Sequence, residues 1–188
     1  MKNNIFNMKS LDLYMSSLTG ERLKSLQCNI QPNHFASSEL MSLDIYLQKF
    51  HQLGAEISRN KDIEAIKEMS KHYNWTNNFD DIFKNNTFEA LVLTDLSKRI
   101  LWVNSGFTEM TGYSKKFAIN KTPSFLQGEQ TSEETRQRIQ QQLLLGTPFK
   151  EVIINHRKDK STYKCEVKIF PLRNSTTTHF LALEKIAL

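Results

Sequence analysis

The chain has 188 residues, a formal net charge of +5 and a hydrophobic fraction of 39%. This length allows one domain with an extension or two small domains, and twelve phenylalanines provide enough apolar surface for a packed core. No stretch is apolar for long enough to span a bilayer, and the N-terminus lacks the apolar run of a signal peptide, so no membrane association is expected. The two cysteines, Cys28 and Cys165, are too few for a disulfide framework or a zinc set, which favours a cytoplasmic protein.

The N-terminal part, residues 1–78, predicts an all-helical extension. One helix is expected from Ser37 to Gly54, because serine favours helix starts and glycine favours helix ends. Its apolar residues are spaced as in a short coiled-coil seam: Leu40, Leu43, Leu47 and Phe50. This stripe predicts either a homodimer seam or a helix packed on its own domain. A second helix fits residues 60–73, and the polar, turn-prone stretch after it predicts a junction with a second domain, residues 79–188.

The second part changes to short strands and helices. Two short apolar runs, residues 90–94 and 99–104, flank a turn and predict a hairpin. Short helices and one longer helix, residues 132–145, are expected next. Three further strands are expected at residues 149–157, 162–173 and 179–186. This order predicts an α+β domain with a five-stranded antiparallel sheet and short helices on one face.

Several strings in this part resemble a PAS domain. Residues 104–113 read N-S-G-F-T-E-M-T-G-Y, which matches the family string N-x-x-F-x-x-x-T-G-Y. Within the family, the chain is similar to the LOV branch, which binds flavin mononucleotide and senses blue light. The branch signature G-R-N-C-R-F-L-Q-G corresponds to N-K-T-P-S-F-L-Q-G at residues 120–128, where the F-L-Q-G half is intact. The resemblance covers residues 79–187 and implies the PAS fold for them.

The chain departs from the LOV branch where the resemblance implies flavin contacts. Pro123 stands at the position of the photoreactive cysteine and has no thiol, so no flavin adduct is expected. Ser124 and Gln140 stand where the branch has two phosphate-binding arginines, and Arg136 lies one helical turn before Gln140. Two lost charge-assisted contacts of about 1.5–3 kcal/mol each lower affinity by roughly two to four decades. We therefore expect no cofactor, with flavin mononucleotide as the alternative.

Strand alternation predicts a candidate ligand cavity on the sheet face that a PAS domain turns toward its helices. Its polar members are Thr122, Gln127, Asn155, Cys165 and Glu184. One interpretation is a small-ligand pocket with a few convergent polar groups. The interpretation we favour at this point is a filled core, in which Glu184 is hydrogen-bonded to Gln127 or Asn155. The glutamate is unusual in either case, because a buried carboxylate needs partners or a raised pKa.

The opposite sheet face is predicted to be too apolar to remain open to solvent. It carries Val152, Ile154, Leu181 and Leu183. The amphipathic N-terminal helices, from the same chain or from a partner, are the expected cover.

No motif indicates catalysis or metal binding. The chain has no dinucleotide-binding or phosphate-binding glycine string and no nucleophile elbow, and its histidines are scattered. We predict a stand-alone, non-enzymatic PAS sensor or interaction protein that acts in cytoplasmic signalling or regulation. It is expected to be a homodimer that acts on a separate, unidentified partner protein. The alternatives are a flavin-binding photosensor without the adduct cysteine and a DNA-associated regulator, which the diffuse charge favours least.

Overall fold

The computed structural model describes residues 43–187. The chain divides into two compact units, Met1–Ile57 and Ser58–Leu188. The expected helix start at Ser37 and the predicted seam residue Leu40 lie outside the described residues.

Helix α3 runs without a break over Leu43–Tyr73. The prediction that Gly54 ends a helix is therefore wrong, as is the separation of this segment into two helices. A glycine inside a helix is less favourable than alanine by only about 1 kcal/mol. The good helix formers that follow, Ala55 and Glu56, and the packing of the helix beyond residue 58 outweigh this term.

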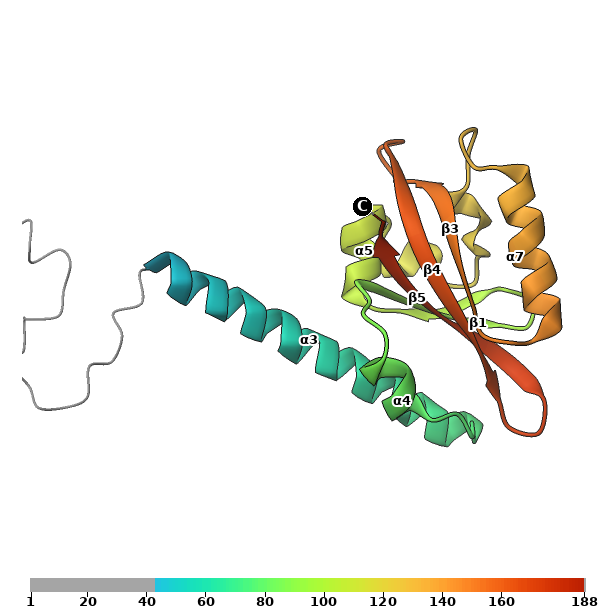
Figure 1. Ribbon diagram of the computed structural model, residues 1–188, viewed down its shortest axis with the longest axis horizontal. Coiled ribbons are helices and arrows are strands. Elements are labelled where there is room, and N and C mark those ends of the chain that lie inside the picture. The colour runs from blue at the N-terminus through green and yellow to red at the C-terminus, as the bar shows by residue number, and fades with distance from the viewer. Residues whose placement is uncertain (1–42, 188) are drawn as a thin grey trace, which may run out of the picture. The chain divides into compact units, whose positions relative to one another are not determined.

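A five-stranded antiparallel sheet forms the centre of the second unit (Figure 1). Its strands are β1 (Ala90–Asp95), β2 (Ile100–Val103), β3 (Phe149–His156), β4 (Thr162–Arg173) and β5 (Thr177–Ile186). They lie in the order β2-β1-β5-β4-β3. The prediction of a five-stranded antiparallel sheet is confirmed, and the predicted strands lie within two residues of the observed ones. Strand β1 is buried along nearly its whole length, which explains why it reads as a continuous apolar run.

Short helical segments connect the strands. They are α4 (Phe79–Lys84), α5 (Ser105–Thr111), α6 (Lys115–Ala118), the 3-10 turn η1 (Pro123–Leu126) and the longer α7 (Glu133–Leu145). Polar N-cap side chains accept a backbone N–H at the start of each α-helix among them: Asn78, Asn104, Ser114 and Ser132. Helix α7 is followed by Gly146 as its C-cap, which has φ +62° in the left-handed region.

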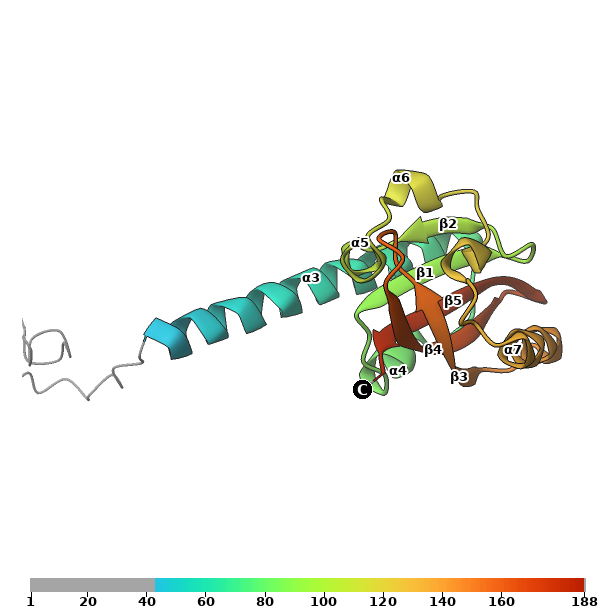
Figure 2. The ribbon, with the colours of Figure 1, turned by 90° about the horizontal axis from the view of Figure 1, so that it is seen from above.

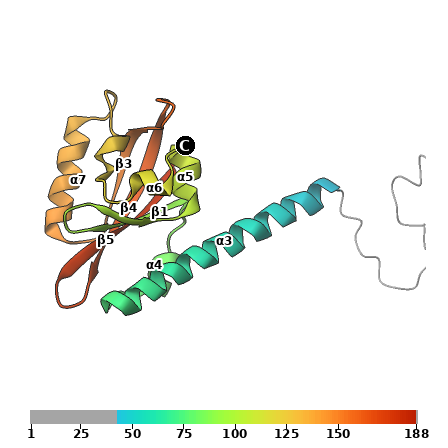
Figure 3. The ribbon, with the colours of Figure 1, turned by 180° about the vertical axis from the view of Figure 1, so that it is seen from behind.

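The first core lies between the sheet and helices α5 to α7, which Figure 3 shows from their own side and Figure 2 from above. Phe107 and Met110 of α5, Ala118 of α6 and Leu126 of η1 pack there against the inner side chains of the strands. Close packing at the start of α5 requires a glycine, because a Cβ on Gly106 would lie 1.8 Å from the carbonyl oxygen of Glu89.

The second core lies on the opposite face of β1 and β5. Residues that precede the sheet form its cover: Ile66 of α3, Trp75, and Phe79 and Phe83 of α4. They pack on Leu91, Leu93, Leu172, Leu181 and Leu183 of the sheet. The compact unit that contains the sheet therefore begins before the junction that we expected near residue 78, because residues 58–78 contribute to its core.

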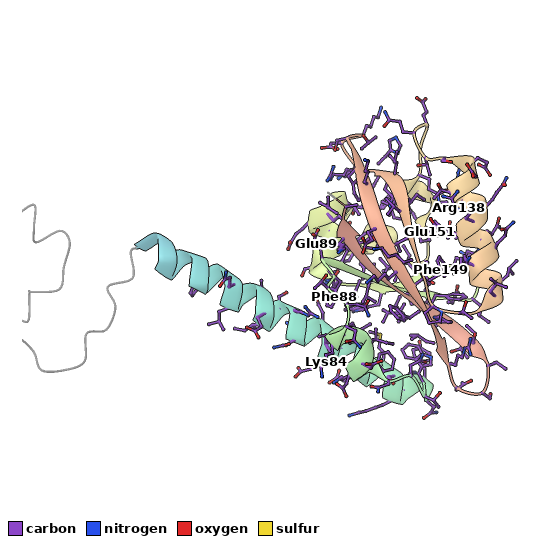
Figure 4. All side chains as sticks on the ribbon, in the orientation of Figure 1. Lys84, Phe88, Glu89, Arg138, Phe149 and Glu151 are labelled. Carbon is purple, nitrogen blue, oxygen red and sulfur yellow. The ribbon has the colours of Figure 1, made fainter. Side chains whose placement is uncertain are left out.

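Polar contacts fix the second half of α3 to α4 and to the segment that leads into β1. The Arg59 Nη2 atom donates to the carbonyl oxygens of Phe83 at 2.7 Å and Asn86 at 3.1 Å, and its guanidinium lies over the Phe88 ring. Figure 4 labels Phe88 between α4 and β1. Lys67 pairs with Asp80 of α4 at 2.5 Å between Nζ and Oδ1. These contacts flank the side of α3 that carries the buried Ile66 and support its burial.

Candidate functional site

A cavity of about 420 Å³ lies on the inner face of the sheet, against α7 and η1. All five residues of the predicted ligand cavity line it: Thr122, Gln127, Asn155, Cys165 and Glu184. Three positions where the chain departs from the LOV branch also line it, Pro123, Ser124 and Gln140, as does Arg136, one helical turn before Gln140. The sheet and the helices thus bring together side chains from five separate segments of the chain.

The cavity wall is mainly apolar. Its apolar members come from the strands, η1 and α7: Val92, Leu126, Ile139, Leu143, Ile153, Val167, Ile169 and Phe180. Its exposed polar members are Thr122, Ser124 and Gln140, which are uncharged, and Glu133 and Arg136, which are charged. Two further lining residues, Lys98 and Glu133, were missed by sequence reasoning. Lys98 lies in the β1–β2 turn with φ +63°, and the turn pattern gives no sign that its side chain reaches the cavity.

Glu184 is a buried carboxylate in the middle of the sheet. It lies opposite Ala90 of β1 and Val167 of β4, and it is only 7% exposed. Its Oε2 atom has no hydrogen-bond partner among the described residues. Burial raises the pKa of Glu184 to about 7, and a hydrogen bond with the Cys165 thiol acts in the opposite direction.

Two expectations about Glu184 are therefore wrong. No hydrogen bond among residues 43–187 joins its Oε2 atom to Gln127 or Asn155, and the inner face is hollow rather than filled. The physical reason is volume: Ala182 and Cys165, which line the cavity beside Glu184, are small side chains. Strand alternation gives the face to which a side chain points, but not the space in front of it.

Two other polar side chains on β4 lie near this carboxylate. Burial raises the pKa of the Cys165 thiol and of the Tyr163 phenol, and the negative charge of Glu184 acts in the same direction on both. Both groups are therefore protonated at neutral pH, and Cys165 has no thiolate character for nucleophilic chemistry. The Tyr163 hydroxyl, like Oε2 of Glu184, is buried without a hydrogen-bond partner in the described part of the chain.

Charged side chains of α7 lie near the cavity opening. Arg136 pairs with Glu133 of the same helix, with 3.1 Å between Nη2 and Oε2. Arg138 is held by Glu134 and by Glu151 of β3, each at 3.3 Å. Figure 4 shows Arg138 and Glu151 side by side where α7 meets the sheet. Of these two arginines, only Arg136 lines the cavity.

The predicted apolar cover surface is only partly covered within the second unit. Leu181 and Leu183 are buried beneath the second core, whereas Val152 of β3 is 44% exposed and Ile154 is partly exposed. In the first unit, Phe50 is exposed on α3. Leu43 and Leu47 lie in the same helix.

Residues 43–187 contain neither a metal-ligand cluster nor a membrane-spanning helix. No three His, Cys, Asp or Glu side chains of residues 43–187 are grouped as a metal site requires. None of the described helices combines the length and the apolar character needed to cross a membrane.

Comparison with known proteins gives a consistent family assignment. The family model for the PAS domain matches residues 89–184. A nitrogen fixation regulatory protein of Klebsiella oxytoca is 34% identical over 98 residues, which are 51% of this chain and 20% of that protein. A blue-light photoreceptor of Listeria monocytogenes is 29% identical over 113 residues, which are 57% of this chain and 45% of that protein. The chain thus spans about a fifth of the first relative and under half of the second.

Solved structures with a similar fold include a LOV domain. The light-state structure of the blue-light photoreceptor Aureochrome1 LOV superposes with a TM-score of 0.53 at 23% identity, over 54% of this chain and 84% of that one. At this identity the likeness concerns the fold alone. The expected resemblance to the PAS family, and to its LOV members, is confirmed.

Proposed function

We propose that this chain, which belongs to the PAS domain family, is a non-enzymatic sensor that binds a small molecule non-covalently in the cavity of its sheet. The observation that carries the proposal is the hollow inner face itself, with mainly apolar walls and a buried carboxylate, Glu184, whose Oε2 atom has no hydrogen-bond partner among the described residues. The names of its relatives, a regulatory protein and a photoreceptor, support a role in signalling or regulation. A cytoplasmic location fits the free thiol of Cys165.

The residues of the cavity do not fit flavin mononucleotide as the LOV resemblance would require. Pro123 offers no thiol for an adduct. Ser124 and Gln140 offer no charge for a phosphate, and Arg136 is already paired with Glu133. Glu184 adds a carboxylate to the cavity wall, and the negatively charged phosphate of the nucleotide is unfavourable in the same cavity. We therefore propose a ligand other than a flavin nucleotide, and a response that does not use flavin photochemistry.

A titration with the neutral fluorophore prodan tests the proposed cavity site. We expect saturable binding with one probe per chain, because the cavity is apolar and large enough for a small aromatic molecule. The Ala182→Phe variant places a ring inside the cavity from β5 and should abolish the binding. A matched control is Leu96→Phe, which adds a similar ring at an exposed turn. Absence of saturable binding, or equal binding by Ala182→Phe, would contradict the proposal.

We also propose that the chain acts as a homodimer through α3 and passes its signal to a separate partner protein. Phe50, Leu53 and Ile57 support this, because each is more than half exposed and their spacing places them on one side of the helix. A second copy is the natural occupant, since an identical stripe provides matching knobs and holes. Light scattering should give the mass of a dimer for the full chain and of a monomer for the Phe50→Ser, Ile57→Ser double variant. A monomeric wild type at micromolar concentration would contradict the dimer.

A further inference from the structure

The Oε2 atom of Glu184 is an unused hydrogen-bond acceptor in the cavity wall. Its residue lies in the centre of the sheet, between Ala90 and Val167 of the neighbouring strands. The residue is nine-tenths buried, lines the cavity and has no hydrogen bond to Oε2 from the described residues. Most buried polar atoms in proteins have a partner, so a donor on a bound ligand would complete the hydrogen bonding of this atom.

No positive charge balances Glu184 within residues 43–187. None of the ion pairs in this part of the chain includes it. The two cationic side chains that line the cavity are Lys98 of the β1–β2 turn and Arg136 of α7, which pairs with Glu133. A buried carboxylate without a counter-charge is unfavourable in its ionised form.

We propose that the cavity binds a small, largely apolar cation whose N–H groups donate to Glu184. This inference rests on the proposed function and adds the chemical class of its ligand. A ligand ammonium or amidinium group provides both the missing charge and the missing donor, and charge-assisted hydrogen bonds are about twice as strong as neutral ones. The apolar wall suits the remainder of such a ligand. A cavity of about 420 Å³ lies within the range of ligand pockets and has room for a substituted aromatic ring.

Three probes with the same ring and different charge test this inference. They are benzamidine, a cation with N–H donors, its neutral analogue benzamide, and the anion benzoate. Calorimetric titration of the full chain at pH 8 should give a Kd for benzamidine at least tenfold lower than for benzamide, with no binding of benzoate.

Two glutamate variants test whether Glu184 causes the preference for benzamidine over benzamide. Glu184→Gln should weaken benzamidine binding at least tenfold. Glu166→Gln removes the same charge from the neighbouring strand β4, where Glu166 pairs with Lys150 and Lys185 instead of lining the cavity. This control should bind benzamidine as the wild type does.

The pH dependence of wild-type binding gives a second readout if Glu184→Gln does not fold. Affinity for benzamidine should rise from pH 6 to pH 8, because Glu184 must lose its proton to pair with a cation. Affinity for benzamide should change little. The other titratable or charged groups near Glu184 are Cys165 and Tyr163 of β4, which stay protonated because burial raises the pKa of each, and Glu89, labelled in Figure 4 just before β1. Lys98, Glu133 and Arg136 also line the cavity.

The outcomes separate this inference from the proposed function. Equal affinities for benzamidine and benzamide, no benzamidine binding at millimolar concentration, or full binding by Glu184→Gln would overturn the inference. Prodan binding that Ala182→Phe abolishes would then still support the cavity as a ligand site. Absence of saturable prodan binding would overturn the proposed function as well.

Discussion

Replacing Glu184 with glutamine should stabilise the ligand-free protein, and more so as the pH rises. Burial raises the pKa of this carboxyl from 4.5 to about 7. Between these values the folded state binds one proton more than the unfolded state, so the free energy of unfolding of the wild type falls as the pH rises through this window. The penalty is nearly absent below pH 4.5 and complete above pH 7. Glutamine keeps the shape of the side chain and does not titrate.

The magnitude follows from the two pKa values. A pKa raised from 4.5 to about 7 corresponds to about 3 kcal/mol at pH 8 and to about 1 kcal/mol at pH 5. The difference in unfolding free energy between Glu184→Gln and the wild type should therefore grow by about 2–3 kcal/mol between pH 5 and pH 8. This change with pH is independent of how well the glutamine amide itself is accommodated.

Urea unfolding followed by tryptophan fluorescence at pH 5, 6, 7 and 8 measures this difference. Glu166→Gln is the matched control, because Lys150 and Lys185 lower the pKa of the Glu166 carboxyl and thereby favour its charged form. Its contribution to stability is present above the unfolded pKa and is lost as the pH falls through the lower folded value. The free energy of unfolding of Glu166→Gln should thus be lower than that of the wild type by up to about 1 kcal/mol, and this difference should be the same at every pH from 5 to 8. If the difference in unfolding free energy between Glu184→Gln and the wild type does not change with pH, the reasoning is refuted. Glu184 would then be charged in the folded state and stabilised by other groups.

Three further predictions concern the second core and its link to the sheet. Ile66→Ala should destabilise the protein by about 2–5 kcal/mol, whereas Leu96→Ala, at an exposed turn, should change stability by under about 0.5 kcal/mol in the same urea experiment. A truncation to residues 58–188 should remain folded by circular dichroism. A truncation to residues 79–188 should aggregate, because it exposes the outer face of β1 and β5. Equal behaviour of the two truncations would show that the cover is dispensable. Asn104→Ala should destabilise the protein by about 2–4 kcal/mol in thermal or urea unfolding. The Asn104 side chain accepts from the backbone amides of Leu91 at 2.9 Å and Phe107 at 3.0 Å, and it donates to the Asp62 carboxylate of α3 at 2.8 Å. A loss under about 1 kcal/mol would argue against this role.

The sheet and its helices could be predicted from the sequence because their signals are local. The strand over residues 162–173 is observed as predicted, and helix α7 (Glu133–Leu145) agrees with the predicted helix over residues 132–145 to within one residue. Lys160 adopts φ +70° at the tip of the β3–β4 hairpin, where the LOV branch has glycine. Turn and cap residues act on the backbone next to them, so their pattern is visible without knowledge of the rest of the fold.

The cover of the outer face was less accessible to sequence reasoning. The heptad spacing of the stripe through Phe50 predicted an apolar contact surface there. The α3 side chain that is fully buried in the second core is instead Ile66, on a segment predicted only as a short helix. Trp75 lies in the polar stretch that suggested a junction, and its ring is nevertheless buried. Periodicity shows that a helix has an apolar face, but tertiary packing decides which part of that face is buried.

The candidate site was predictable in membership and not in volume. Alternation placed Asn155, Cys165 and Glu184 on one face, and all three line the cavity. The hollow in front of them depends on how far α7 and η1 lie from the sheet, and no local pattern reports that separation. For the same reason, the sequence could not show that Glu184 would lack a partner among the amides near it.

The central claim is that this PAS domain holds its ligand without flavin photochemistry, and an absorbance spectrum tests it most directly. The purified full chain should be recorded before and after blue illumination, both as isolated and after incubation with flavin mononucleotide. Because Pro123 replaces the reactive thiol and Ser124 and Gln140 replace the phosphate ligands, we predict no flavin bands as isolated and no reversible light-induced loss of the blue band after incubation. Stoichiometric flavin in the isolated protein, or a blue band that bleaches in light and recovers in the dark, would contradict the account.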